Sequence, residues 1–316
     1  MTKIAKTAVS LAALIAATSG AQAADTVRVT FQSQGDTLVG TLYLPEDRHS
    51  GEALNAVVVT GAWTTVKEQM PATYAAELAA RGYAALTFDF RGWGESDGAP
   101  RQLEDPARKI EDIVAAASFL DGLEGIDTVG GLGICASAGY MVEASIRSDA
   151  IQSVGLVAPW LHDAAIVDAV YGGPDAVAGL IATGREAQAH YAATGEARMI
   201  PAASATDPTA LMGGAPYYVD PERGAIAEYV NEFNLASWEG WLTFDALALG
   251  PQMTNPLVLV HSEAAAIPHG AQAFEAAGDK VRGVWLDDVT QFDFYDQPQA
   301  VTRASDEVAA HFDDTL

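Results

Sequence analysis

The sequence is poor in cysteine and in positive charge. Cys135 is the only cysteine among 316 residues, so the chain cannot form an internal disulfide. Lysine and arginine number 17 against 42 aspartate and glutamate residues, which gives a formal net charge of −25 at pH 7. Such a surface repels phosphates, which argues against binding to nucleic acid or to an anionic membrane. The charge favours solubility and identifies no substrate.

Sequence signatures of metal and nucleotide chemistry are also missing. The chain has no HExxH pattern and no cluster of histidine and aspartate, and a single cysteine excludes a cysteine-rich metal site. The glycine-rich segment RGWGESDG at 91–98 lacks the strand–GxGxxG–helix spacing of a dinucleotide site. We therefore expect no metal and no cofactor.

The first 23 residues have the pattern of a secretory signal. Lys3 and Lys6 precede the apolar run AVSLAALIAA, which is followed by the small-x-small sequence Ala21-Gln22-Ala23. The run is shorter than a bilayer span, so we expect a cleaved signal and no membrane anchor. The sequence predicts export across the inner membrane, most simply to a bacterial periplasm, with no membrane contact after cleavage.

Strand-like and helix-like segments alternate through most of the remaining chain. Two β-branched runs around a Gly35-Asp36 turn predict an N-terminal hairpin. Apolar runs that alternate with helical segments predict a mostly parallel, doubly wound α/β sheet covered on both faces. The runs lie at 56–60, 83–90, 128–134, 153–158, 255–261 and 281–288, with helices expected at 74–82, 105–121, from about 138, at 270–278 and from about 299.

The alternation breaks between residues 159 and 252, which carry helical patterns at 175–194 and 223–233. We expect 159–252 to form a helical cap inserted into a core made of 24–158 and 253–316. The aromatic side chains of this cap would suit an apolar or ring-bearing substrate, or would simply pack the cap onto the core. They include Tyr171, Tyr217, Tyr218, Trp238 and Trp241.

The segment GGLGICASAGYM at 130–141 has the pattern of a strand, a tight turn and a helix. In the related pattern G-x-S-x-G, the turn holds a nucleophile in strained backbone geometry. Cys135 and Ser137 both fit the nucleophile position. The strand runs directly into a turn at Cys135, whereas Ser137 would lengthen it by two residues, so Cys135 is favoured and Ser137 is the alternative. A helix N-terminus lowers the pKa of a cysteine, and a thiolate is the stronger nucleophile.

The segment GICASAGY resembles the G-x-C-x-G-G turn of dienelactone-hydrolase-like proteins, a branch of the α/β-hydrolase superfamily. VVVTGAWTTVKEQM, FDFRGWGESDG, APWLHD, VHSEAAAIPHGAQAF and QFDFYDQP resemble further segments of this branch, in order along nearly the whole mature chain. The resemblance implies the α/β-hydrolase fold and acyl hydrolysis or transfer through a nucleophile, an acid, a histidine and an oxyanion hole. By position, the hole would consist of the backbone N–H groups of Ala136 and of Ala62 or Trp63.

Two residues of this pattern are replaced in the chain. The resemblance implies an aspartate after the seventh strand and a histidine after the eighth, where the chain has Ala265 and Gln291. Glutamine cannot act as a general base. Substitutes near the same sheet edge are Glu263 as the acid and His261 as the base, and a base must come within hydrogen-bond reach of the thiol.

Further residues are expected near the substrate or as alternative catalytic groups. His162 and His269 are alternative bases, and Asp163 is an alternative acid, although an aspartate at that position is equally expected to cap a helix. The residues that we expect to line the substrate pocket are Glu68, His162, Asp163, Tyr217, Trp238 and Gln291.

The preferred interpretation is a hydrolase that acts on a small ester, thioester or lactone through Cys135. Its thiol would use a substitute base, or only the helix dipole and the oxyanion donors. The alternatives are a non-catalytic homologue that binds a ligand in the same pocket, and an acyltransferase or lyase on the same fold, because a fold does not determine a reaction. In every case the expected partner is a small molecule.

Overall fold

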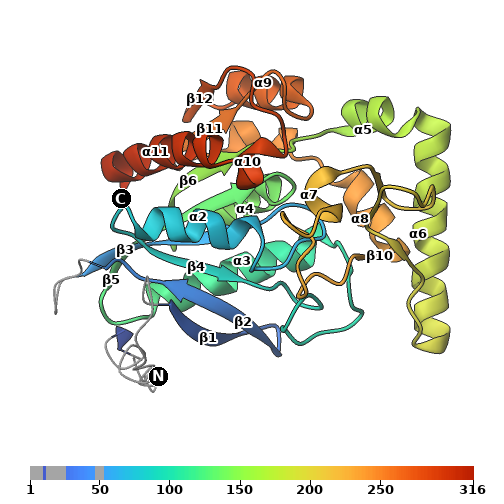
Figure 1. Cartoon of the computed structure of the whole chain (residues 1–316), viewed down its shortest axis with the longest axis horizontal. Helices are drawn as coiled ribbons and strands as arrows, with labels where there is room; N and C mark the ends of the chain where they lie inside the picture. The colour runs from blue at the N-terminus through green and yellow to red at the C-terminus, as the bar shows by residue number, and fades with distance from the viewer. Residues whose placement is uncertain (1–9, 12–25, 47–52) are drawn as a thin grey trace.

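An eight-stranded sheet forms the centre of the molecule (Figure 1). The computed structural model describes residues 10–11, 26–46 and 53–316, so nearly all of the predicted signal lies outside the described residues. In spatial order the strands are β1 (Thr26–Ser33), β2 (Asp36–Tyr43), β4 (Ala84–Phe88), β3 (Leu54–Thr60), β5 (Ile126–Ile134), β6 (Ile151–Val157), β11 (Leu257–His261) and β12 (Val281–Trp285).

The first two strands form the predicted hairpin. β1 and β2 pair antiparallel from Thr26 opposite Tyr43 to Ser33 opposite Asp36. Gln34 and Gly35 in the turn both have positive φ, as a tight hairpin turn requires. Residues of β1 alternate strictly between exposed and buried, because one face of this edge strand packs on the core and the other meets solvent.

The remaining strands are parallel to one another. All of them except the partly exposed edge strand β12 are largely buried on both faces, which is why their sequences are mostly apolar runs. On one face of the sheet lie α2 (Met70–Ala79), α10 (Asp293–Asp296) and α11 (Pro298–Thr315). On the other lie α3 (Pro106–Asp121), α4 (Ser137–Arg147) and α9 (Pro268–Ala277). The predicted α/β architecture is confirmed.

A long segment between β6 and β11 extends beyond the sheet, at the right of Figure 1. Its helices are α5 (Ala164–Tyr171), α6 (Pro174–Thr194), α7 (Pro216–Val219) and α8 (Trp238–Thr243), with 3-10 turns at Leu235–Ser237 and Leu247–Gln252. Its short strands are β7 (Met199–Pro201), β8 (Ala203–Ser204), β9 (Met212–Gly213) and β10 (Glu232–Asn234). The exact division of the chain into core and cap stays a prediction.

The prediction of a helix at 175–194 is confirmed by α6, but the prediction of a helix at 223–233 is wrong. Those residues form turns and then β10, which pairs antiparallel with β7. Asn231 has a φ of 56° and its side chain bonds both the N–H and the C=O of Ala203. These tertiary bonds hold the chain in a strand pairing that the local pattern did not reveal.

Among the described residues, no single helix is both long and apolar enough to cross a membrane. The pair α5 and α6 meets the length and composition criterion only when taken together, across a bend of 93°.

Candidate functional site

Cys135 occupies the turn between β5 and α4. Its φ is 55°, a left-handed backbone conformation that is uncommon for residues other than glycine, asparagine and aspartate. Its N–H donates to the carbonyl of Val157 at 3.1 Å, and its own carbonyl accepts from the N–H groups of Ala138 and Trp160 at 3.1 and 3.0 Å. These bonds tie the turn to the end of β6 and to the first turn of α4.

The glycine before this turn has a steric reason. A Cβ placed on Gly133 would come within 2.8 Å of Cα of Ala138, so only glycine lets α4 approach the strand this closely.

Ser137, the alternative nucleophile, is the first residue of α4 and is fully buried. Its hydroxyl accepts from the N–H of Ile134 at 3.2 Å and donates to the carbonyl of Ile134 at 3.1 Å. These contacts close the turn, and the side chain does not line the cavity into which Cys135 faces.

A cavity of about 510 Å³ lies over the carboxyl ends of β3, β5 and β6 and reaches under the β6–β11 segment. In an open parallel sheet, this edge is where ligands bind. Among the described residues, the lining of this cavity includes no charged side chain. The polar groups on the wall are those of Cys135 and Gln291 and of its aromatic residues. Those rings are Trp63, Trp160, Tyr171, Tyr218, Trp241, Phe292 and Tyr295.

Four donors surround the sulfur of Cys135. Burial raises the pKa of the Cys135 thiol above its ordinary value, and the Tyr295 hydroxyl has the largest opposing effect. The backbone N–H groups of Ala136 and Trp63 and the Gln291 amide also act to lower this pKa. Burial outweighs them, so the thiol is protonated at neutral pH. The two backbone N–H groups are the predicted oxyanion donors, and both approach the sulfur.

The loop after β3 holds Trp63 in place. Ala62 does not line the cavity, and its carbonyl accepts from the N–H and the hydroxyl of Thr65 at 3.4 and 2.7 Å. Thr64 has a φ of 64°, a strained conformation for a β-branched residue. Its hydroxyl lies 3.1 Å from that of Tyr229. Of the two alternatives that the sequence left open, Trp63 is the one whose N–H faces Cys135.

Gln291 is the predicted pocket residue that does line the cavity. Its Oε1 accepts from the N–H of Ala266 at 3.1 Å, and its Nε2 donates to the carbonyl of Ala158 at 2.9 Å and to the Tyr295 hydroxyl at 3.2 Å. The side chain therefore bridges the ends of β6 and the loop after β11, and these bonds fix its orientation beside the thiol.

The candidate histidines lie away from the sulfur. His162 accepts from Trp160 Nε1 at 2.9 Å on Nδ1, and its Nε2 lies 3.1 Å from the carbonyl of Trp241, so both ring nitrogens are engaged. Burial lowers its pKa. His261 is fully buried, bonds the carbonyl of Ala266 through Nε2, and has a pKa lowered by burial to about 4. His269 is exposed on α9. None of these three residues lines the cavity.

The candidate acids also lie outside the cavity lining. Glu263 is exposed and accepts from Gln272 Nε2 at 2.6 Å. Asp163 caps α5, where its carboxylate accepts from the N–H of Ile166 at 2.9 Å. This is the helix-capping role that the sequence allowed for it.

Three other residues expected in the pocket are held elsewhere. Glu68 pairs with Lys67 at 2.5 Å, and burial raises its pKa. Tyr217 packs edge-on against Tyr295, and Trp238 packs against Trp63, so both support cavity walls from behind. The spacing of aromatic residues in the sequence did not distinguish the rings that face the cavity from those one layer deeper.

Tyr295 is a site residue that sequence reasoning missed. It is buried at the start of the C-terminal helical region, and its hydroxyl contacts both the Cys135 sulfur and Gln291. Its position four residues after Gln291 is the available signal, because residues at this spacing share one side of a helical turn.

A cluster of three carboxylates is formed by Glu68, Asp89 and Glu95, whose ligand atoms lie within 4.8 Å of one another. Lys67 Nζ sits among them, at 2.5, 2.8 and 2.7 Å respectively. The ammonium group already supplies the positive charge that a metal would supply, so this cluster is explained as an ion-pair network.

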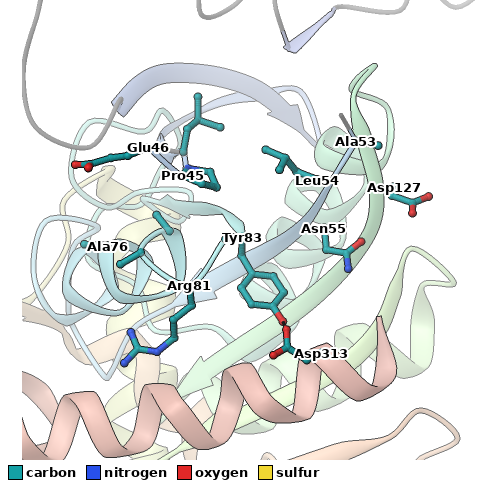
Figure 2. Close-up of a pocket in the computed structure, with 14 residues that line it drawn as sticks. Pro45, Glu46, Ala53, Leu54, Asn55, Ala76, Arg81, Tyr83, Asp127 and Asp313 are labelled. Atoms are coloured by element: carbon teal, nitrogen blue, oxygen red, sulfur yellow. Dashed lines mark hydrogen bonds between the residues drawn. The ribbon is translucent and has the colours of Figure 1, made fainter. Parts of the chain in front are cut away.

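A second cavity, of about 760 Å³, lies at the opposite edge of the sheet (Figure 2). It is bordered by Asn55 near the start of β3, Asp127 in β5 and the end of α11, where Tyr83 donates to Asp313 at 2.5 Å. Glu46 and Ala53 line this cavity, and residues 47–52 between them lie outside the described residues, so the cavity is assigned no role.

Residues 56–304 match the alpha/beta hydrolase family, and the chain belongs to this family. The uncharacterized protein YcjY of Escherichia coli (strain K12) is 27% identical over 299 residues, which covers 89% of this chain and 95% of that protein. The polyketide transferase claH of Penicillium crustosum is 35% identical over 134 residues, 40% of this chain and 43% of that protein.

A solved structure extends the likeness to nearly the whole fold. The crystal structure of hypothetical protein PA2218 from Pseudomonas aeruginosa matches with a TM-score of 0.80 and 25% identity, over 93% of this chain and 94% of that chain. The predicted α/β-hydrolase fold is thereby confirmed.

Proposed function

We propose that this α/β-hydrolase-family protein takes the acyl group of a small, uncharged ester, thioester or lactone onto the thiol of Cys135. The observation that carries the proposal is the convergence of the Ala136 and Trp63 N–H groups on the Cys135 sulfur at the wall of an apolar cavity. Donors in this arrangement stabilise the oxyanion that forms when a nucleophile adds to a carbonyl, a contribution of about 3 kcal/mol for one donor in other acyl-transfer enzymes.

The lining of the cavity supports the choice of substrate. Its seven aromatic rings suit an apolar or ring-bearing acyl group, and a charged acyl group would lose its hydration with no described partner of opposite charge on the wall. In the reaction, the sulfur adds to the carbonyl carbon, the bond to the leaving oxygen or sulfur breaks, and the thiol proton leaves with that group.

The second half of the reaction is expected to be slow with water as the acyl acceptor. Water must lose a proton as it attacks the Cys135 thioester, and Gln291, beside the sulfur, cannot accept one. We therefore propose that the acyl-enzyme accumulates and that turnover is limited by its breakdown. The part-length likeness to a polyketide transferase agrees with acyl transfer as the reaction class.

The test is intact-mass spectrometry of the protein after exposure to uncharged aryl esters and thioesters of increasing acyl size. We expect one acyl group per chain in the wild type and in Ser137→Ala, and none in Cys135→Ala. An adduct that is lost only in Ser137→Ala would transfer the role to the serine.

The absence of an adduct in the wild type, together with saturable binding of the same esters, would instead support the ligand-binding alternative. The observation that favours this alternative is the raised pKa of the Cys135 thiol. Calorimetric titration of Cys135→Ala with the ester measures binding without chemistry and separates the two outcomes.

A further inference from the structure

A buried ion pair lies behind the candidate site and is not explained by the sheet or by the cavity lining. Glu104 and Lys109 have side chains that are 0% and 3% exposed, and Lys109 Nζ lies 2.8 Å from the carboxylate. The ammonium also lies 4.6 Å and 4.7 Å from the ring centres of Phe90 and Trp93. Removing two charges from water is costly, so such a pair is weak support for a purely stabilising role.

The two oxygens of Glu104 reach the two halves of the proposed oxyanion hole. Oε2 accepts from the N–H of Thr64 at 3.4 Å, directly after Trp63 in the loop that follows β3. Oε1 accepts from the hydroxyl of Tyr140 at 3.0 Å, in the helix that begins after Cys135. One carboxylate therefore connects the loop that carries one donor with the helix that carries the other.

The loop needs such support because its conformation is strained. The left-handed φ of Thr64 costs free energy, so the geometry persists only where surrounding bonds impose it. The Thr64 N–H bonded to Glu104 and the Thr64 hydroxyl beside Tyr229 supply those bonds. The same loop determines the direction of the Trp63 N–H.

We infer that Glu104, held by Lys109, is a positioning residue that sets the spacing between the Trp63 and Ala136 donors. The inference deepens the proposed function and rests on it, since its expected effect on chemistry requires acylation of Cys135. Glu104 itself does not line the cavity and does not meet the substrate.

The informative variant is Glu104→Met combined with Lys109→Met, which removes both charges together. Methionine has neither of the carboxylate oxygens, so the bonds to the Thr64 N–H and to the Tyr140 hydroxyl are both lost. Asp112→Asn is the matched control, because Asp112 is also a buried carboxylate of this region, paired with Arg91 at 2.6 Å, and does not contact the loop after β3.

Two reactions of Cys135 distinguish positioning from a general structural role. Acylation by an aryl ester develops an oxyanion, whereas alkylation by iodoacetamide displaces iodide at a methylene carbon and develops none. We expect the double variant to acylate about tenfold more slowly at saturating ester, with a clearly smaller loss in alkylation, which depends on the thiolate fraction alone. Equal losses in both reactions, or no loss in acylation, would overturn the inference.

Amide hydrogen exchange of residues 62–66 tests the same point without any acyl chemistry. Exchange there should be faster in the double variant than in Asp112→Asn, at equal global stability measured by thermal unfolding. If the wild type is not acylated at all, the proposed function fails, and exchange alone decides whether Glu104 positions the loop. Unchanged exchange would overturn the inference.

Discussion

The two sides of the cavity around Cys135 differ in what they offer to a reaction. The donor side, formed by Trp63, Cys135 and Ala136, presents a thiol in a strained turn with two backbone N–H groups directed at it. The base side, formed by Ala266 and Gln291, presents a side-chain amide that is fixed by three hydrogen bonds. The first side can stabilise negative charge, and the second can hold atoms in place but cannot accept a proton.

The difference shows that the parts of an acyl-transfer site are separable. Donors made of backbone depend on the course of β3, β5 and α4 and on the bonds that hold the Trp63 loop, and not on the chemistry of the donor residues' own side chains. A general base depends on one side chain, and a change at residue 265 or 291 leaves the fold intact. The following predictions test whether this separation is real.

Installing a base should have the largest effect. Ala265→Asp with Gln291→His places an imidazole where the Gln291 amide now lies, within reach of the loop at 265–266 and of the thiol. General base catalysis typically contributes about 10²-fold or more, so steady-state ester hydrolysis should rise by about 10²-fold. The steady-state rate of ester hydrolysis is measured from the alcohol that is released.

Gln291→His alone is the control for that pair, because the ring would lack an acid to orient it. A rate in the double variant no higher than in the single variant would mean that the base side is not oriented for catalysis. If the acyl-enzyme of the wild type already breaks down quickly, the base side would not lack a general base, and the contrast between the two sides of the cavity would be wrong.

The pH dependence of acylation should be the next largest effect. Burial raises the pKa of the Cys135 thiol, so the reactive thiolate fraction grows about tenfold per pH unit at least up to its ordinary pKa near 8.5. Acylation rates between pH 6 and about 8.5 should therefore rise without a plateau. In the base-installed variant the plateau should appear at lower pH, since an imidazole would take up the thiol proton.

Removing the Tyr295 hydroxyl should have a smaller effect on the donor side. The hydroxyl has the largest lowering effect on the pKa of the Cys135 thiol, so Tyr295→Phe should raise that pKa further. At pH 7.5 we expect alkylation by iodoacetamide to slow severalfold, because a smaller fraction of the thiol is then ionised. Tyr217→Phe, a buried ring that packs on Tyr295 without lining the cavity, should leave the rate unchanged.

Replacing His261 should change acid stability but not chemistry. Its pKa is lowered to about 4 in the folded protein and is about 6.5 when unfolded, so the unfolded state binds more protons between these values. The contribution of the neutral ring is fully present above pH 6.5 and is lost as pH falls towards 4, by up to about 3 kcal/mol. Denaturant unfolding of His261→Gln should show a shallower loss of stability across this range.

Acylation by His261→Gln at pH 7.5 should match the wild type. A large loss of acylation rate in this variant would make His261 a catalytic candidate again. It would also mean that the base side influences the thiol through the loop at 262–266.

The sequence indicated the fold, the turn at Cys135 and the loss of the expected histidine, but not the contacts that hold the donor side in place. The turn at Cys135 could be read from local pattern, because its small residues and the strand before it are contiguous in the chain. The replacement of the expected histidine by Gln291 was also visible. The role of Glu104 was not, since its partners Thr64, Lys109 and Tyr140 come together only when three elements pack.

Patterning by itself determined the alternation of strands and helices, the parallel sheet and the place of Cys135, because periodic burial leaves its mark on neighbouring residues. The tertiary structure decided which rings face the cavity, which way the Trp63 loop turns and that the candidate histidines point elsewhere. It also turned 223–233 from a helix into turns and a strand. These outcomes depend on hydrogen bonds between residues far apart in the chain, which local periodicity does not record.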